Sequence, residues 1–182
     1  RVFATIDLEP TIYDKPDAIE LNEAIVSVEF KDVHFTYPGT SIKVLSGISF
    51  KAEGGDFLGV MGHTGAGKTT ILKLLMSYYV PDSGDVLING QSLNDFTLHS
   101  VRDKIGFVSQ EPFLFYGTVS DNVRYNQEST DEELNVALKL AGAWDFIQEL
   151  ENGLDTMVGD RGAKLSGGQR ARVSLARALL KQ

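Results

Sequence analysis

One nine-residue segment, GHTGAGKTT at positions 62–70, limits the folds open to this chain more than any other feature. It fits the pattern G-x-x-x-x-G-K-[ST], in which a glycine-rich backbone turns its N–H groups toward a phosphate. That pattern works where a strand enters the loop and a helix leaves it. The apolar run FLGVMG at 57–62 predicts a buried strand, and the periodic segment TTILKLLMSYY after Lys68 predicts a helix. We therefore expect an α/β fold built on a P-loop NTPase core.

Each residue type in this loop has a chemical reason to be there. Gly62, Gly65 and Gly67 allow the backbone to approach a phosphate closely. Lys68 is expected to reach the outer phosphates, and the Thr69 hydroxyl to bind the Mg²⁺ that bridges them. The helix that begins near Lys68 directs its partial positive end at the same anion. The expected nucleotide-binding residues of the loop are Gly62, His63, Thr64, Gly65, Ala66, Gly67, Lys68, Thr69 and Thr70.

The loop alone does not select the base of the nucleotide. A guanine reader of the Asn-Lys-x-Asp type is not present, because no Asn in the sequence precedes a Lys. Tyr37 lies at the end of an alternating stretch, directly before a Pro-Gly turn, and its ring could stack on an adenine face. A place in the core or at its rim is the alternative for this side chain.

Short stretches of alternating apolar and polar residues predict a small antiparallel sheet. Glycine, proline and asparagine pairs mark the turns between them. The stretches are 26–30, 33–37 and 48–52, with turns at Pro38-Gly39 and Gly54-Gly55. The segment SGDVLINGQSL at 83–93 contains another strand, with a turn at Asn89-Gly90. The apolar segment KIGFVSQ at 104–110 predicts one more buried strand.

The rest of the chain has helical periodicity. Thr130 and Glu133 have the spacing of a capping box, and Ser166 and Gln169 repeat it. Leu134, Ala137, Leu138 and Ala141 would line one face of the first helix; Val173, Ala176 and Leu180 would line the last. A further helical patch runs through Trp144, Ile147 and Glu151.

Composition excludes several classes of protein. The formal net charge of −8 disfavours a general nucleic-acid binder, so the basic residues of the last helix (Arg170, Arg172, Arg177 and Lys181) are interpreted as a solvated face. The chain has no cysteine, which excludes disulfides and thiolate metal sites and favours a reducing compartment. Its three histidines are far apart and lack the spacing of metal ligands.

Taken together, these motifs resemble the nucleotide-binding domain of the ATP-binding cassette family. VHFTYPG is similar to its aromatic loop, GHTGAGKTT to its Walker A loop, FVSQEPFLFYGTVSDNV to its Q-loop, and LSGGQ to its signature motif. The resemblance implies ATP and Mg²⁺ as ligands, adenine stacking by Tyr37, and a contact of Gln110 with the metal and the attacking water. Catalytic roles then fall to Lys68 and Gln110, and metal contacts to Thr69 and Gln110. It also implies that Ser166, Gly167, Gly168 and Gln169 contact the nucleotide of a second, oppositely oriented domain.

Finer features resemble the exporter branch of this family. The stretch TMVGDRGAKLSGGQ is similar to the exporter segment that contacts coupling helices of a transmembrane domain, with Asp160 where a Glu is usual. Residues 1–24 are similar to a connector arm from a membrane domain, and 25–182 to a partial nucleotide-binding domain whose helical subdomain covers about 111–175. The implied location is the cytoplasmic face of a membrane, through a fused transmembrane domain outside this chain.

The family pattern continues beyond Leu180 into an apolar strand that ends in Asp and Glu, which order the metal shell and polarise the attacking water. No apolar run in these 182 residues closes on Asp-Glu, so the C-terminal strands of the fold are expected to be missing. We therefore expect the chain by itself to be inactive as an ATPase, and its parent protein to hydrolyse ATP. Two alternatives stay open: a soluble cassette ATPase that acts on DNA or the ribosome, and a nucleotide-binding module that does not hydrolyse.

Overall fold

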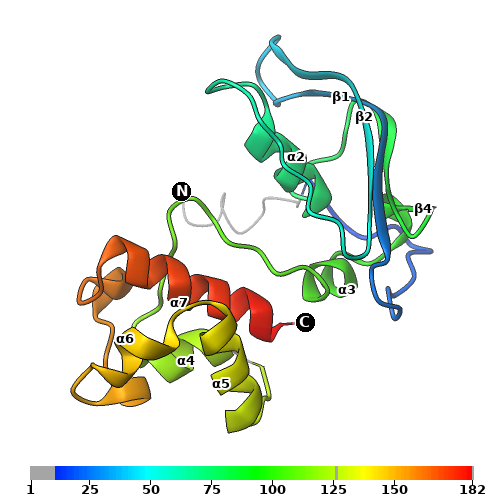
Figure 1. Cartoon of the computed structure of the whole chain (residues 1–182). Helices are drawn as coiled ribbons and strands as arrows, with labels where there is room; N and C mark the ends of the chain where they lie inside the picture. Colours follow the sequence, from blue (N-terminus) through cyan, green and yellow to red (C-terminus); the bar gives the residue numbers. More distant parts are fainter. Residues whose placement is uncertain (1–10, 126, 182) are drawn as a thin grey trace, which may run out of the picture. The chain divides into compact units, whose positions relative to one another are not determined.

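The computed structural model describes residues 11–125 and 127–181 in two compact units (Figure 1). The first, which we call the sheet unit, ends at Arg102, and the second, the helical unit, begins at Asp103, the last residue of the helix Leu98–Asp103. The sheet unit contains β1 (Ser27–Thr36), β2 (Lys43–Glu53), α2 (Lys68–Leu75), β3 (Ser83–Ile88), β4 (Gln91–Ser92), the 3₁₀ turn η1 (Leu93–Asp95) and α3 (Leu98–Asp103). The helical unit contains α4 (Val119–Arg124), α5 (Asp131–Leu140), α6 (Trp144–Gln148), η2 (Gly153–Asp155), η3 (Asp160–Gly162) and α7 (Gly167–Leu180).

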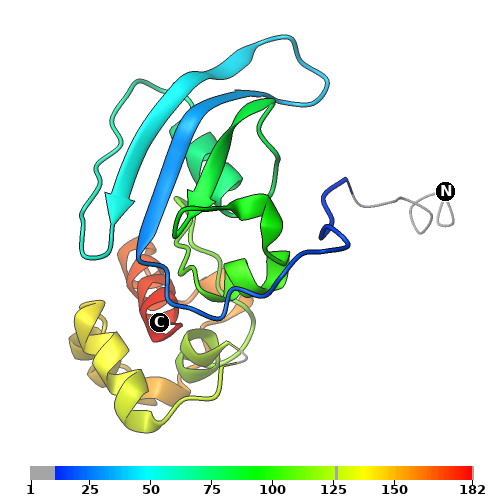
Figure 2. The ribbon, with the colours of Figure 1, turned by 90° about the vertical axis from the view of Figure 1, so that its right-hand side faces the viewer.

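The antiparallel sheet is confirmed. Its strand order is β2-β1-β3-β4, and Figure 2 shows β1 between β2 and β3. The two stretches predicted at 26–30 and 33–37 are one bulged strand, because Asp32 has a φ of 47° and the register with β2 shifts between Phe30 and Val33. Phe30 stacks on Phe50 across the strands, with ring centres 4.7 Å apart.

The strands predicted at 57–62 and 104–110 are wrong. Both segments lie outside regular structure, and in the described residues neither pairs with a strand. Phe57 is fully exposed and Met61 nearly so. An apolar sequence forms a strand only where a neighbouring strand accepts and donates its backbone hydrogen bonds, and within residues 11–125 and 127–181 no strand pairs with either segment.

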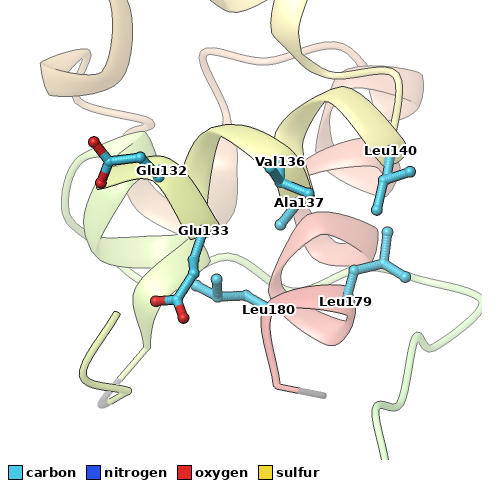
Figure 3. Close-up of a pocket in the computed structure, with 7 residues that line it drawn as sticks. All are labelled: Glu132, Glu133, Val136, Ala137, Leu140, Leu179 and Leu180. Carbon is cyan, nitrogen blue, oxygen red and sulfur yellow. The ribbon is translucent and has the colours of Figure 1, made fainter. Parts of the chain in front are cut away.

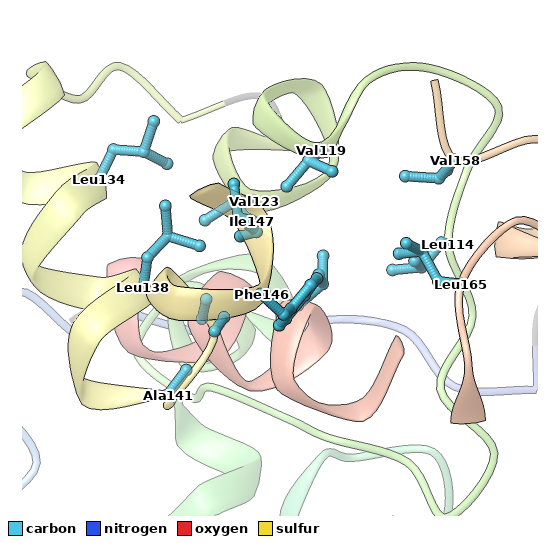
Figure 4. Packing of buried hydrophobic residues seen from close by; sticks show 13 residues of the cluster. Leu114, Val119, Val123, Leu134, Leu138, Ala141, Phe146, Ile147, Val158 and Leu165 are labelled. Carbon is cyan, nitrogen blue, oxygen red and sulfur yellow. The ribbon is translucent and has the colours of Figure 1, made fainter. Parts of the chain in front are cut away.

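The helical unit folds around its own apolar core, shown in Figure 4. Leu134 and Leu138 of α5, Ile147 of α6 and Val173 of α7 are at most 1% exposed. The predicted apolar faces of α5 and α7 are thus the faces that pack, although Leu180 is only partly buried. The patch expected at 144–151 gives the short helix α6, and Glu151 lies in the turn that follows it.

Three helices of this unit begin with a reciprocal capping box, two of which were predicted. In α5, Glu133 N–H donates to Thr130 Oγ1 at 3.2 Å, and the Glu133 carboxylate accepts from Thr130 N–H at 2.8 Å. In α7 the same pair of bonds joins Ser166 and Gln169. The box of α4, formed by Thr118 and Asp121, was not predicted.

The capping carboxylates give the helical unit a dependence on pH. Bonds from the Thr130 backbone and side chain lower the pKa of Glu133 from its ordinary value of 4.5. A lowered folded-state pKa means that this stabilisation is present above the unfolded pKa and is lost as pH falls through the folded one. We expect Glu133→Gln, which keeps the acceptor oxygen but not the charge, to show a smaller loss of stability between pH 6 and 3. Urea unfolding followed by Trp144, the chain's only tryptophan, measures this; identical pH profiles would contradict it.

Residues 11–24, the described part of the expected connector, form an arm along the sheet unit; residues 1–10 lie outside the described residues. Ile19 N–H donates to the Asp95 carbonyl at 2.9 Å, and its carbonyl accepts from Thr97 N–H at 2.8 Å. Leu21 is buried, and its N–H donates to Ser100 Oγ at 2.9 Å. The arm is therefore hydrogen-bonded to residues 95–100 of the same unit. None of the helices in the described parts of the chain combines the length and apolar character that a membrane crossing requires.

Candidate functional site

The phosphate loop lies in the sheet unit, and the helix predicted after it is confirmed as α2. Gly67 precedes this helix in the left-handed conformation with a φ of 90°, and no side chain caps the helix start. The first N–H groups of α2 are thus not satisfied by a capping side chain. Such a helix start is suited to an anion.

Lys68 holds the loop together in this conformation. Its Nζ donates to the carbonyl oxygens of Gly62 and His63, both at 2.8 Å. The backbone five and six residues before Lys68 is thereby folded back over the lysine side chain. The ammonium sits inside the glycine loop, where a bound phosphate would meet it. Thr69, the predicted metal residue, follows with an exposed side chain, whereas Thr70 is buried.

Tyr37 is joined to the phosphate loop by a contact that the sequence did not predict. Its hydroxyl lies 3.0 Å from Thr70 Oγ1, in the first turn of α2. Its ring packs edge-on against Phe35 and Tyr79, and the Lys73 ammonium lies 5.2 Å from the ring centre. A residue proposed to contact the base is thus bonded to the helix that follows the phosphate loop.

Gly67 is required by packing as well as by its backbone conformation. A Cβ at this position would lie 2.7 Å from Leu45 Cδ2 and 3.1 Å from the Val44 carbonyl oxygen of β2. A Cβ at Gly65, which has a φ of 86°, would meet nothing within 4 Å. We expect Gly67→Ala to cost roughly 2–4 kcal/mol of unfolding free energy and Gly65→Ala roughly 1–2 kcal/mol. Urea unfolding of both variants tests this, and equal losses would contradict it.

In the helical unit, Gln110 and the start of α7 border one cavity of about 790 Å³. The segment after Gln110 forms one wall, and η3 with the first turns of α7 forms the other. The lining residues are Gln110, Glu111, Pro112, Phe113, Asp160, Arg161, Ala163, Gly167, Arg170 and Ala171. Two motifs that are more than 50 residues apart in sequence are therefore neighbours in space.

The signature residues form a capped helix start with an open surface. Ser166, Gly167 and Gly168 are exposed. Ser166 Oγ accepts a hydrogen bond from Gln169 N–H at 3.2 Å, which leaves the hydroxyl proton able to donate to an anion. No Cβ contact within 4 Å would arise at Gly168 from the chain itself. The surface at this corner is open to a ligand.

The interpretation of the last helix as a solvated basic face is wrong for two of its residues. Arg170 Nη1 donates to the Leu165 carbonyl at 2.6 Å, and Arg177 donates to the carbonyls of Phe113 and Asn122. Only Arg172 is exposed as expected. Sequence periodicity cannot identify such arginines, because their partners are backbone carbonyls elsewhere in the chain.

Comparison with known proteins places the chain in a family. A family model described as ABC transporter matches residues 45–182. The ATP-dependent lipid A-core flippase of Desulfotalea psychrophila is 46% identical over 181 residues, which cover 99% of this chain and 31% of that protein. Human ATP-binding cassette sub-family B member 5 is 40% identical over 189 residues, covering 100% of this chain and 15% of that protein.

A solved structure matches as well. The structure of a bacterial Atm1-family ABC exporter with ATP bound aligns with a TM-score of 0.92 and 39% identity, over 98% of this chain and 31% of the other. The antiparallel sheet and helices thus have the mixed α/β fold of an ABC ATPase, as the sequence predicted. The chain belongs to the ABC transporter family. It spans about a third or less of the length of these relatives.

Proposed function

We propose that this chain is the ATP-binding domain of an ABC exporter, which binds Mg-ATP and drives export through ATP-dependent dimerisation and hydrolysis in a longer protein. One observation carries the proposal: Lys68 Nζ bonds the carbonyls of Gly62 and His63 in the glycine loop, and this loop leads into the start of α2, which no side chain caps. The names of the relatives, a flippase and an exporter among them, support the transport role.

In the proposed site, Tyr37 stacks on the adenine and residues 62–70 surround the phosphates. Lys68 neutralises charge on the outer phosphates. Thr69 and Gln110 are the residues proposed to hold Mg²⁺, which would supply Lewis-acid stabilisation of the phosphate oxygens. The exposed hydroxyl of Thr69 fits a hard cation that prefers oxygen ligands.

The proposed second half of each site comes from a partner domain. Ser166, Gly167, Gly168 and Gln169 of one domain would cover the nucleotide held by the glycine loop of the other. The exposure of Ser166, Gly167 and Gly168 supports this role, since a residue that acts on a second copy has to lie on the surface. ATP binding then becomes domain association, and loss of the γ-phosphate becomes separation.

The 790 Å³ cavity of the helical unit is the proposed seat for a coupling helix of the transmembrane domain. Glu111, Asp160, Arg161 and Arg170 at its border offer both signs of charge to such a helix. Because Gln110 and Gly167 border the same cavity, a helix seated there would contact both nucleotide motifs. The domain would thereby work at the cytoplasmic face of a membrane.

Hydrolysis by the 182 residues alone is not part of the proposal. A general base is worth about 10²–10⁴ in rate, and the sequence has no apolar strand that closes on Asp-Glu. We propose that the longer protein supplies the Asp and the Glu of that strand, including the Glu carboxylate that polarises the attacking water.

The decisive experiment uses the full-length protein in lipid vesicles. We expect Mg-dependent ATP turnover that co-sediments with membranes and requires the transmembrane part. ATP turnover that is stimulated by DNA or ribosomes and does not depend on a membrane would overturn the exporter proposal. Tight Mg-ATP binding without turnover would favour the non-hydrolysing module instead.

A further inference from the structure

Arg177 joins three segments of the helical unit through one guanidinium group. It lies on α7, and its Nη1 donates to the Phe113 carbonyl at 3.0 Å. Its Nε donates to the Asn122 carbonyl at 2.7 Å, and its Nη2 to Asn122 Oδ1 at 2.9 Å. The signature helix is thus bonded to the segment after Gln110 and to α4.

Asn122 extends this connection to the rest of the segment. It is 1% exposed, and its Nδ2 donates to the carbonyls of Phe115 and Thr118, both at 2.9 Å. Its Oδ1 also accepts from Phe115 N–H at 2.8 Å. Every side-chain polar atom of this buried amide is used, so Asn122 fixes the backbone from Phe115 to Thr118 relative to Arg177.

Two aromatic rings lie near the guanidinium of Arg177. Phe115 and Tyr125 stack with ring centres 4.5 Å apart, and the guanidinium carbon lies 5.5 Å and 5.3 Å from their respective centres. Burial lowers the pKa of Arg177 from its ordinary value, but an arginine keeps its charge in proteins. A planar, delocalised cation is the side chain that suits both the rings and the two carbonyls.

The position of these bonds relates them to the proposed site. Phe113 follows Gln110 by three residues, and α7 begins at the signature residues. Arg170, two turns before Arg177 on the same face, bonds the Leu165 carbonyl and borders the cavity with Gln110. Arg170 thus fixes the entry to α7, and Arg177 fixes the segment that leaves Gln110.

We propose that Arg177 is a positioning residue that holds the Gln110 segment and the signature helix as one rigid body, so that a movement of either is transmitted to the other. The proposal rests on the proposed function for the roles of Gln110 and Ser166. Its structural half does not require ATP.

The test compares Arg177→Met with Arg172→Met in the full-length protein, with cysteines outside this chain replaced. Both changes remove one positive charge from α7, but Arg172 is exposed, and its guanidinium lies over the Phe146 ring instead of bonding the Gln110 segment. Nitroxide labels at the exposed positions Glu111 and Glu132 report the distance between the Gln110 segment and the helical core. We expect Arg177→Met to broaden the label distance distribution, and Arg172→Met to leave it as in the parent.

Turnover supplies the second readout. We expect Arg177→Met to lower kcat for ATP about tenfold with KM within about twofold, because the glycine loop belongs to the other unit. Arg177→Lys keeps the positive charge but not the planar guanidinium that makes several hydrogen bonds. We expect its label distance distribution and its kcat to lie between those of the parent and of Arg177→Met, and it replaces Arg177→Met in the test if that variant does not fold. The proposal would be overturned if Arg177→Met left the label distance distribution unchanged. It would also be overturned if Arg177→Met broadened that distribution but had the same kcat as Arg172→Met. Absence of ATP turnover in the parent protein would refute the proposed function, while the distance measurement would still decide the role of Arg177.

Discussion

Replacing Lys68 with alanine is expected to weaken Mg-ATP binding about 100-fold and to abolish turnover in the full-length protein. The ammonium provides charge-assisted hydrogen bonds to the outer phosphates, and a loss of about 2.7 kcal/mol corresponds to this factor. The variant also loses both bonds that close the loop, to the carbonyls of Gly62 and His63. Isothermal calorimetry measures the affinity, and phosphate release measures turnover.

Lys51→Ala is the matched control for this experiment. Lys51 is an exposed lysine of the same unit, and its Nζ pairs with exposed Glu53 at 2.7 Å. An exposed ion pair of this kind contributes little to stability. We therefore expect Lys51→Ala to have the Mg-ATP affinity and the ATP turnover of the parent. If Lys68→Ala bound Mg-ATP with an affinity within threefold of that of the parent, the loop would not be the site that binds the phosphates.

Ser166→Arg is expected to prevent ATP-driven dimerisation of the domains while leaving ATP binding by each domain unchanged. A long cationic side chain at this exposed corner would occupy the space of the partner's nucleotide. The glycine loop of the same chain belongs to the sheet unit and is not altered by the change. Cross-linking, carried out once with Mg-ATP and once with a non-hydrolysable analogue, measures dimerisation. Calorimetry measures nucleotide binding.

Two further variants separate the capping role of Ser166 from its role across the dimer. Ser166→Thr keeps the acceptor for Gln169 N–H and should dimerise as the parent does. Ser166→Ala loses the cap, at a cost of about 1 kcal/mol in stability, without adding bulk. If Ser166→Arg dimerised as readily as Ser166→Thr, the exposed signature corner would not be an interface.

The sequence predicted best those features that depend on neighbouring residues. The capping boxes at Thr130 and Ser166 and the turn at Asn89-Gly90 are confirmed because their partners lie within three residues. The apolar segments 57–62 and 104–110 resemble strands, but strand formation depends on a neighbour that the segment itself does not contain.

The arginines of α7 show that site contacts, like strands, cannot be predicted when the partners lie far apart in sequence. Arg177 binds oxygens of residues 55 and 64 positions earlier, and no local pattern distinguishes it from exposed Arg172. Tyr37 was singled out for its ring, whereas its hydroxyl bond to Thr70 joins residues 33 positions apart. Motifs identified the loop and the signature, but the contacts that connect them to their surroundings are non-local.

The arm at residues 11–24 has a mechanical consequence. Its bonds are distributed from Asp14, which accepts from Leu98 N–H, to Ala24, whose carbonyl accepts from Asn89 Nδ2. Tension applied at Thr11 would therefore reach several hydrogen-bonded attachments before it reached β1, which follows the arm in the chain. A force transmitted along this segment would act first on the backbone at Leu98 and on the Asn89 side chain, to which the arm is bonded.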